Sequence, residues 1–430
     1  MTFHIFTLGC KVNQYESQAM HEKLEKSGFT YSQSHKDADI VIVNSCTVTA
    51  ASDSKAVKLM HRIKRENSQC VLILTGCLPQ AFPDDVRFAE ADVVLGNKSR
   101  NAVVPSIQKF LMTGTRIIDV QKHDSSEKFE HMSLEGFSER TRAFVKIEDG
   151  CNRFCSYCII PYARGRVRSK PLPEIYNELS HLRMKGFKEV VLVGINLSAY
   201  GQEFGINLAD AVEAACSVEG IERVRLGSLE PERMDNYTIA RLSRLPKLCP
   251  QFHLSLQSGC DATLKRMNRH YTTQIYSEIV QNLRMAFDNC SITTDIMVGF
   301  PGETQIEFEQ SLAFAEKIQF AKAHIFAYSR RPGTAADKAE NQIPENVKNI
   351  RCNRMIELTD KTTRKFLESQ TGKVEAVLFE RLKNGFFEGH TMNYTKVIVK
   401  PHNTDNLSNL ICKVKITGVE NGNCTGILQP

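Results

Sequence analysis

Short apolar runs alternate with helical patterns along most of this chain, and this alternation limits the folds that it can adopt. Strands and helices that follow one another in turn imply parallel sheets joined by right-handed crossovers. The first region, residues 1–120, shows this pattern. Its expected strands are Phe3–Leu8, Ile40–Asn44, Val71–Thr75 and Val93–Leu95, and its expected helices are Gln14–Ser27, Ala50–Glu66 and Asn101–Met112. We therefore expect an N-terminal α/β domain with a parallel sheet.

A second region, residues 142–345, repeats the alternation with six strands. The expected strands are Phe144–Ile147, Val190–Val193, Val224–Leu226, Phe252–Leu256, Ile292–Met297 and Ala323–Phe326, separated by expected helices at Pro173–Lys185, Leu208–Ser217, Asp235–Arg244, Thr273–Phe287 and Thr304–Ile318. Six such strands suit an open, partial (β/α)6 barrel with its site at their carboxyl ends. The segment between the two regions, residues 121–141, is polar and without period, which indicates a linker.

The last region, residues 370–430, has no helical pattern. Its expected strands are Val374–Phe379, Phe386–Thr391, Thr395–Val399 and Cys412–Val419, with Gly, Asn and His in the turns. This pattern is typical of a small β-barrel. A basic helical connector, residues 346–369, joins it to the second region.

Three cysteines, Cys151, Cys155 and Cys158, lie in one short loop directly after the first expected strand of the second region. Three thiolates at this CxxxCxxC spacing can hold three irons of a 4Fe-4S cube, whereas an electron-transfer cube takes four cysteines. No fourth cysteine follows within fifty residues, so one iron stays open to a ligand. The alternatives are a zinc loop or a chance cluster of core cysteines, and zinc favours paired CxxC ligands.

A second set of cysteines, Cys10, Cys46 and Cys77, is spread along the first region, each just beyond an expected strand. The carboxyl ends of parallel strands meet at one edge of a sheet, so these thiols are expected to converge. Gly9 and Gly76 next to them permit tight turns. Three convergent thiolates form another three-cysteine 4Fe-4S site. The alternative is that these small, easily buried residues serve only for packing.

Composition narrows the class of protein. The chain has 14 cysteines among 430 residues and begins without a basic segment followed by a long apolar run. Cysteines without a secretory signal indicate metal or redox chemistry rather than disulfides. No run is long enough for a transmembrane helix, so we expect a cytoplasmic protein without a membrane partner.

Positive charge is concentrated around the cysteine loop. Residues 140–170 contain eight basic and two acidic residues, an excess of six that equals the net charge of the whole chain. This excess indicates a polyanionic substrate near the loop. The alternative is a solvated basic face.

Longer motifs surround both cysteine sets: Thr7–Gln14 (TLGCKVNQ), Asn44–Val48 (NSCTV), Gly76-Cys77, Ile159–Ser169 (IIPYARGRVRS), Leu256–Gly259 (LQSG), Met267–Arg269 (MNR) and Asp295–Glu303 (DIMVGFPGE). Together with the CxxxCxxC loop they resemble the methylthiotransferases, which are radical S-adenosylmethionine (SAM) enzymes with two clusters. The resemblance covers essentially the whole chain. The last region resembles the TRAM domain, an RNA-binding module.

The resemblance implies a function. The motif GCKVNQ at Cys10 looks like the branch that converts threonylcarbamoyladenosine at position 37 of tRNA to its 2-methylthio derivative. Two other branches, which act on isopentenyladenosine in tRNA or on a ribosomal-protein aspartate, usually differ there. The implied cofactors are two 4Fe-4S clusters and SAM, and the implied partners are tRNA and a reductant such as flavodoxin or ferredoxin. We expect a monomer.

The resemblance also implies residues that bind SAM. Tyr157 is expected near the adenine, Gly194 and Asn196 near the amino group, and Gly299 with Glu303 on the adenine and ribose side. Further residues near strand ends or in basic segments are expected to contact SAM or RNA: Glu230, Gln257, Arg269, Arg330, Arg331, Arg364 and Lys365. For each of them the alternative is a cap, a turn or an exposed helix position.

Two other classes of protein compete with this interpretation. A two-cluster electron carrier would need closed four-cysteine clusters, which the incomplete cysteine sets do not provide. A non-catalytic iron-sulfur RNA-binding protein would explain the basic segments but not the open irons. Cleavage of SAM after reduction separates both from an enzyme.

Overall fold

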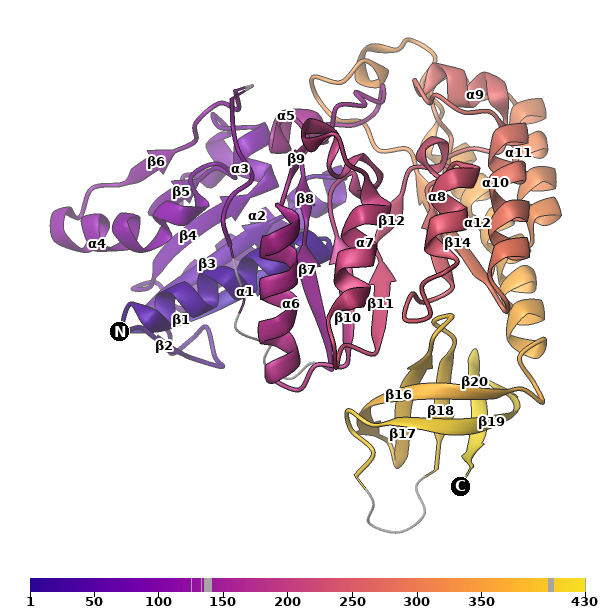
Figure 1. Cartoon of the computed structure of the whole chain (residues 1–430). Helices are drawn as coiled ribbons and strands as arrows, with labels where there is room; N and C mark the ends of the chain where they lie inside the picture. The colour runs from indigo at the N-terminus through magenta and orange to yellow at the C-terminus, as the bar shows by residue number, and fades with distance from the viewer. Residues whose placement is uncertain (125, 133, 135–140, 401–405, 430) are drawn as a thin grey trace.

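The chain folds into three parts. A computed structural model describes all of it except residues 125, 133, 135–140, 401–405 and 430. Arg140, at the start of the basic stretch, therefore lies outside the described residues. An N-terminal α/β domain stands beside an open barrel, and a small closed β-barrel lies at one end of the open barrel (Figure 1). The expected fold class is confirmed.

A six-stranded parallel sheet, in the order β2-β1-β3-β4-β5-β6, forms the centre of the N-terminal domain. Its two middle strands, β3 and β4, are buried along their whole length, which explains their continuous apolar runs. The strands are β1 (Thr2–Thr7), β2 (Thr30–Tyr31), β3 (Ile40–Ser45), β4 (Val71–Gly76), β5 (Val93–Leu95) and β6 (Ile117–Asp119). The edge strands β2 and β6 were not expected, because two or three residues carry no periodic signal.

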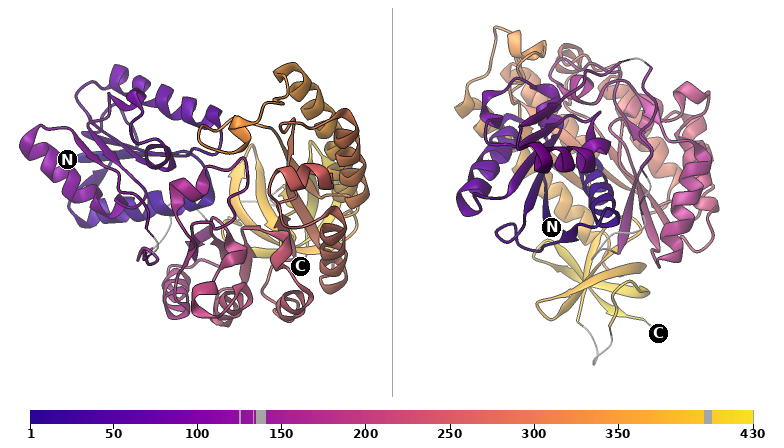
Figure 2. Two further views of the ribbon diagram at one scale, coloured as in Figure 1. Left: turned by 90° about the horizontal axis from the view of Figure 1, so that it is seen from above. Right: turned by 90° about the vertical axis from the view of Figure 1, so that its left-hand side faces the viewer.

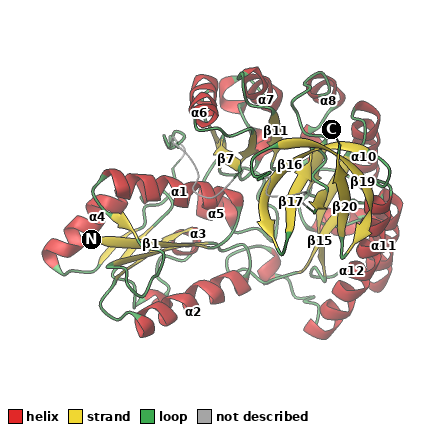
Figure 3. Ribbon diagram, turned by 90° about the horizontal axis from the view of Figure 1, so that it is seen from below, coloured by secondary structure: helices red, strands yellow, loops and turns green. Residues whose placement is uncertain are grey.

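Helices cover both faces of this sheet (Figure 3). On one face, α2 packs through Met60 and Ile63. On the other, α1 packs through Leu24 and α4 through Ile107. The helices are α1 (Lys11–Lys26), α2 (Ala50–Glu66), α3 (Cys77–Ala81) and α4 (Val103–Thr113). This arrangement leaves the carboxyl ends of β1, β3 and β4 side by side at one end of the sheet. The N-terminal domain lies beside the open barrel (Figure 2).

The open barrel is formed by two parallel sheets, β11-β10-β7 and β12-β13-β14-β15. Its strands are β7 (Arg142–Lys146), β10 (Glu189–Val193), β11 (Arg223–Leu226), β12 (Ser228–Leu229), β13 (Gln251–Leu254), β14 (Ser291–Val298) and β15 (Lys322–Ala327). All six expected strands are present, with ends displaced by two residues or fewer, and β12 is additional. A short hairpin, β8 (Glu148–Asp149) with β9 (Arg168–Ser169), encloses the cysteine loop.

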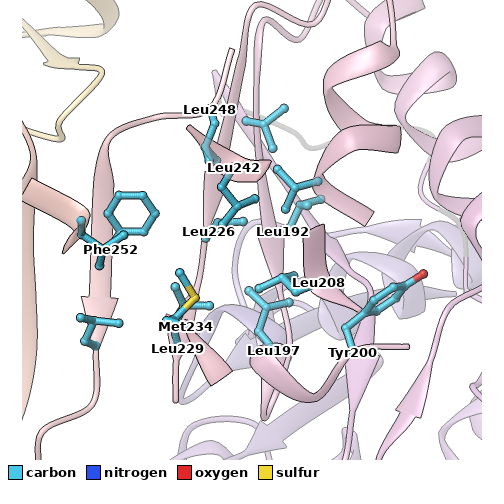
Figure 4. Packing of buried hydrophobic residues seen from close by; sticks show 14 of the residues in the cluster. Leu192, Leu197, Tyr200, Leu208, Leu226, Leu229, Met234, Leu242, Leu248 and Phe252 are labelled. Carbon is cyan, nitrogen blue, oxygen red and sulfur yellow. The ribbon is translucent and has the colours of Figure 1, made fainter. Parts of the chain in front are cut away.

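Helices on the outside of the barrel bury one continuous core. Figure 4 shows part of it, where Leu192, Leu226 and Phe252 of the strands meet Leu208 and Leu242 of the helices. The helices are α5 (Ile160–Arg164), α6 (Leu172–Met184), α7 (Leu208–Ser217), α8 (Asn236–Leu242), α9 (Asp261–Arg266), α10 (Thr273–Ala286) and α11 (Gln305–Ile318). Short 3₁₀ helices lie at Val86–Phe88, Arg100–Ala102, Leu197–Ala199, Gln202–Phe204, Pro231–Arg233 and Ala336–Lys338.

The segment expected as a linker contributes to the core. Its described residues contain no helix or strand after β6. Met132 and Leu134 nevertheless join the core of the open barrel, and Phe129 is buried. The Tyr15 hydroxyl donates a hydrogen bond of 2.6 Å to the Met132 carbonyl. This segment therefore holds the first two domains together as well as joining them.

The last part of the chain is a helix followed by a closed barrel. The helix α12 (Glu345–Glu368) coincides closely with the expected connector, and no described helix is long and apolar enough to cross a membrane. The barrel order is β16-β17-β18-β20-β19. Its strands are β16 (Val374–Lys383), β17 (Phe386–Thr391), β18 (Lys396–Val399), β19 (Ile411–Glu420) and β20 (Asn423–Leu428). Only β20 was missing from the expected set.

The small barrel docks on the amino ends of the open-barrel strands, opposite the cysteine loop (Figure 1). Buried Arg223 and Arg225 donate hydrogen bonds to carbonyls of β16, of β17 and of the turn after it, at 2.7–3.3 Å. The guanidinium of Arg225 also lies 4.6 Å from the centre of the Tyr394 ring. Removing the small barrel would leave two buried guanidinium groups without these partners.

Candidate active site

The three-cysteine loop projects from the carboxyl end of β7 and is fixed at both of its ends. The Cys151 amide donates to the Gly165 carbonyl at 3.0 Å, and the Cys158 amide donates to the Cys155 carbonyl at 2.9 Å. The amide and the hydroxyl of Ser156 donate hydrogen bonds to backbone carbonyls at the end of α9. The three cysteines remain half-buried, so the loop presents its thiols toward an accessible space.

Gly150 allows the chain to enter this loop. It has φ +92°, and a Cβ there would lie 2.0 Å from the Arg166 carbonyl oxygen. We expect Gly150→Ala to lower the free energy of unfolding by about 2–5 kcal/mol, since backbone strain and a backbone clash add together. Gly186→Ala is the matched control, because Gly186 has φ +87° and no atom of the described residues lies within 4 Å of its Cβ position. It should cost about 1–2 kcal/mol. Equal losses in urea-induced unfolding would contradict a role for the clash.

Polar side chains surround the thiols of the loop. Asn196 Nδ2 lies 3.7 Å from Cys151 Sγ, and Arg269 Nη1 lies 3.4 Å from Cys155 Sγ. Burial raises the pKa of Cys151 to about 12 and that of Cys158 well above its usual range. These thiols therefore release protons when they bind a metal. Donors aimed at the sulfurs are the kind of group that tunes an iron-sulfur cluster.

The second cysteine set converges at the edge of the N-terminal sheet. Cys10 precedes α1, Cys46 follows β3 and Cys77 begins α3. A Cβ on Gly9, which has φ +112°, would lie 3.1 Å from Cys46 Sγ, so the turn after β1 passes directly against that thiol. Burial, followed by the charge of Cys77, raises the pKa of Cys46 to about 12. Cys46 and Cys77 are buried, whereas Cys10 is exposed.

Arg164 connects the two cysteine sets. It belongs to α5, which begins two residues after Cys158, and its Nε lies 3.1 Å from Cys77 Sγ. The other guanidinium nitrogens donate to Glu16 at 2.5 and 3.0 Å and to Asn13 at 2.8 Å. A residue from the barrel thus donates to a thiol of the N-terminal domain.

Most of the basic stretch at residues 140–170 is buried in ion pairs, which corrects the expectation of a polyanion-binding surface. Lys146 pairs with Glu16 at 3.0 Å and Arg168 with Glu127 at 3.2 Å. Lys146 and Arg168 also pair with Asp149. The other described pairs are Arg142 with Glu380 and Glu189, Arg153 with Glu232, Arg164 with Glu16 and Asp149, and Lys170 with Glu178. Arg166 alone of the described cations in this stretch is exposed without an ion pair. Except for Asp149, these carboxylate partners lie outside residues 140–170, so a count of charges within the stretch missed them.

A cavity of about 190 Å³ lies between the two cysteine sets. Val48 and Thr49, just after Cys46, form one side of it. The cysteine loop and the carboxyl ends of the barrel strands form the rest, through Tyr157, Cys158, Ile159, Ile160, Gln257, Asp295, Met297, Phe326, Ala327 and Ser329. This space is the candidate active site, because residues next to both cysteine sets line it.

The residues expected at the SAM amino group adjoin Cys151. Asn196 donates from its backbone to Glu148 Oε2 at 2.7 Å, and a Cβ on Gly194 would lie 2.6 Å from that oxygen. Glu148 Oε1 and Asn196 Oδ1 are buried acceptors without a hydrogen-bond donor among the described residues. Glu148 was not expected here, and burial raises its pKa well above the usual value. Nothing in the sequence distinguished it from its acidic neighbour Asp149.

Other expected SAM-binding residues lie near the loop with partners of their own. Glu230 pairs with Arg269 at 2.5 Å. Gln257 lines the cavity and has φ +64°. Glu303 accepts from the Gly299 amide at 2.6 Å and pairs with Arg351, so it fixes the turn after β14. Tyr157 lies edge-on to Phe300, with ring centres 6.3 Å apart.

The remaining expected arginine and lysine positions do not converge on the cavity. Buried Arg331 donates to Thr47 and pairs with Asp53 at 2.7 Å, so it links the barrel to the N-terminal domain. Arg330 is exposed and pairs with Asp337. Arg364 and Lys365 are exposed on α12, as the alternative of a solvated helix face predicted.

No group of three His, Cys, Asp or Glu side chains among the described residues is placed to hold a single metal ion. A 4Fe-4S cube sets a different requirement, since each thiolate binds a separate iron and the thiols stand around the cube rather than around one point. The half-buried thiols, the donors aimed at them and the buried acceptors beside Cys151 fit such a group with a bound ligand.

Comparisons with known proteins agree with this geometry. Residues 2–96 match the uncharacterized protein family UPF0004, and residues 145–315 match the radical SAM superfamily. The chain is 38% identical to the threonylcarbamoyladenosine tRNA methylthiotransferase MtaB of Thermotoga maritima, over 92% of this chain and 90% of that protein. It is 35% identical to MtaB of Bacillus subtilis, over 97% of this chain and 93% of that protein. The chain belongs to the methylthiotransferase family of radical SAM proteins.

Some similar relatives in the methylthiotransferase family are named for a different substrate. The tRNA-2-methylthio-N(6)-dimethylallyladenosine synthase of Caldicellulosiruptor saccharolyticus is 35% identical, over 93% of this chain and 87% of that protein. Among solved structures, the radical SAM methyltransferase TsrM of Kitasatospora setae, with cobalamin and a [4Fe-4S] cluster, has a TM-score of 0.58 at 12% identity. It covers 78% of this chain and 76% of TsrM, which shows a shared fold.

Proposed function

We propose that this chain is a tRNA methylthiotransferase that converts threonylcarbamoyladenosine at position 37 to its 2-methylthio derivative. The observation that carries the proposal is the cavity whose walls come from both sides, next to Cys46 and next to Cys158. Cys158 and the residues that follow Cys46, from separate domains, thereby border one space large enough for part of a nucleoside. The named relatives that share 35–38% identity over nearly the whole chain support the substrate.

The two cysteine sets have separate roles in this proposal. Cys151, Cys155 and Cys158 hold a 4Fe-4S cluster with SAM, and Cys10, Cys46 and Cys77 hold a second 4Fe-4S cluster. Bound there, these groups supply the radical chemistry that an unactivated aromatic C–H bond requires, together with the sulfur and the methyl group. A flavodoxin or ferredoxin is the proposed reductant, and the chain is proposed to act as a monomer.

The protein's own residues bind, orient and exclude water. Glu148 Oε1 and Asn196 Oδ1 would accept hydrogen bonds from the amino group of SAM, which would satisfy both buried oxygens. Arg269 is held by Glu230 and offers its Nη1 to Cys155. The apolar walls of the cavity, including Ile159 and Met297, would exclude water from the reacting base.

Domain roles follow from the same proposal. Residues 1–120 would carry the second cluster, residues 121–141 would join the domains, and residues 142–345 would form the radical SAM domain. The connector at residues 346–369 and the TRAM-like barrel at residues 370–430 would contact tRNA phosphates. The burial of the basic stretch shifts most of that contact to other exposed cations, among them Arg364 and Lys365 on α12.

The largely apolar cavity also favours a second candidate substrate, adenosine with an isopentenyl group at N6. The test uses the reduced holoenzyme with SAM and two anticodon stem-loop RNAs, one with each modified adenosine at position 37. We expect mass spectrometry of the nucleosides to find the 2-methylthio product from the threonylcarbamoyl RNA. Product from the isopentenyl RNA alone would reassign the substrate, and product from neither RNA would reject the function.

A further inference from the structure

The start of helix α1 fills part of the lumen of the open barrel. Val12 packs against Val191 and Val193 of β10, and Phe144 of β7 packs against the same cluster. Successive residues of a strand face opposite sides, so the neighbours Val190 and Leu192, which belong to the outer core, confirm that Val191 and Val193 face inward. The first turn of α1 therefore closes the β7–β10 side of the lumen from within.

Lys11, the residue before Val12, is an unpaired cation at this place. Its side chain is exposed, and no hydrogen bond or ion pair joins it to any described residue. The charges of Arg225, Arg142 and Glu189 act on it without an ion pair. Both arginines are themselves paired, Arg225 with Glu189 at 2.9 Å and Arg142 with Glu380 at 3.2 Å. The ammonium group of Lys11 is thus available to an anion in the lumen.

Strands β14 and β15 form the opposite side of the lumen, between Lys11 and the cavity. Met297 and Phe326 are paired neighbours on β14 and β15 and line the cavity. Asp295 and His324, the next inward-facing pair, lie two residues lower, which is about 6–7 Å along the strands. The charge of Lys11 acts on His324. His253 Nε2 lies 3.3 Å from Asp295 Oδ2.

We propose that Lys11 binds the carboxylate of the threonylcarbamoyl group and so selects this substrate over an uncharged N6 substituent. The inference rests on the proposed function. Threonine joined to the base through a carbamoyl group carries a free carboxylate, whereas an isopentenyl group carries no charge. With the adenine in the cavity, an N6 substituent that extends down the lumen brings its carboxylate toward Lys11. An ammonium group is a compact point charge with three donors that suits this anion.

The test compares two anticodon stem-loop RNAs on one preparation of the reduced holoenzyme with SAM. One RNA carries threonylcarbamoyladenosine, and the other carries its carboxamide analogue, which differs only in the charged group. Hydrogen bonds to charged groups account for a preference of roughly 10- to 100-fold. We expect the wild type to show this preference in KM and in the Kd from fluorescence polarisation. Lys11→Gln should reduce it to about threefold or less, and Lys11→Arg should retain part of it.

Lys58→Gln is the matched control, because Lys58 is an exposed lysine on α2 of the same domain, on the surface rather than in the lumen. The preference of Lys58→Gln for the threonylcarbamoyl RNA over the carboxamide RNA should equal that of the wild type. The preference is a ratio between two RNAs measured on one preparation. A loss of iron or of folded protein in Lys11→Gln affects both RNAs equally and does not change this ratio. A ratio that is unchanged in Lys11→Gln, or a wild type that does not distinguish the two RNAs, overturns the inference while the proposed function stands. A wild type that thiomethylates only isopentenyl RNA rejects the proposed function itself.

Discussion

Arg164→Met is expected to lower the free energy of unfolding by about 3–5 kcal/mol, because it leaves buried carboxylates without a partner. Glu16 and Asp149 are almost fully buried, and Arg164 contacts both. Burial alone would raise the pKa of Glu16, yet Arg100, Arg164 and Lys146 together lower it to about 2. The carboxylate therefore stabilises the fold at neutral pH and loses this effect as the pH falls through its folded pKa. In Arg164→Met that loss should begin at a higher pH.

Arg166→Met is the matched control for this variant. Arg166 lies two residues further along the same segment and is exposed without an ion pair to any described residue, so its loss should change stability by about 0.5 kcal/mol or less. The measurement is the urea midpoint, followed by circular dichroism at pH 7 and at pH 5. A midpoint for Arg164→Met that matches the control would show that the remaining cations suffice for Glu16. Arg164→Lys retains the charge but not the bidentate contact with Glu16. Its urea midpoint should lie between those of Arg164→Met and Arg166→Met.

Replacing Cys151, Cys155 and Cys158 together by alanine should remove about half of the iron and abolish cleavage of SAM. Two three-cysteine sets predict two 4Fe-4S clusters, or about eight irons per chain, of which about four should remain. Each cysteine is half-buried in a loop held by backbone hydrogen bonds, so the substitutions leave the loop anchored. The measurements are the iron content of anaerobic preparations and the methionine released after reduction. Retention of all the iron would contradict the ligand assignment.

The matched variant replaces Cys10, Cys46 and Cys77 by alanine. It should also retain about four irons, but it should keep some cleavage of SAM and form no thiomethylated nucleoside. Cys77 receives a hydrogen bond from Arg164, so this variant also tests whether the two sites are structurally coupled. Formation of product at the normal rate would show that these cysteines do not supply the sulfur.

The sequence predicted regular elements well where the periodic signal was long. The strands of all three parallel sheets appear within two residues of their expected ends, except for β2, β6 and β12, which are two or three residues long and were not expected. The expectation that residues 140–170 form an exposed positive surface was wrong for a different reason. Lys146, Arg164 and Lys170 look like a surface stretch in sequence, yet each has a carboxylate partner on α1 or α6. Glu16 lies more than one hundred residues from Lys146 and Arg164, so these pairs leave no local pattern. Glu178 is only eight residues from Lys170, but it lies outside the stretch in which the charges were counted.

The same distinction holds at the candidate site. The sequence by itself determined the two cysteine sets and the strands they follow, because loop spacing and strand ends are local features. Only the tertiary structure placed Val48 beside Cys158 around one cavity and joined Arg164 to Cys77. It also placed Lys11 near Arg142 and Arg225 without an ion pair to any described residue. These relations depend on how the N-terminal domain packs against the barrel. That packing follows from burying Tyr15, Val12 and the ion pairs of Glu16 together, which no single segment specifies.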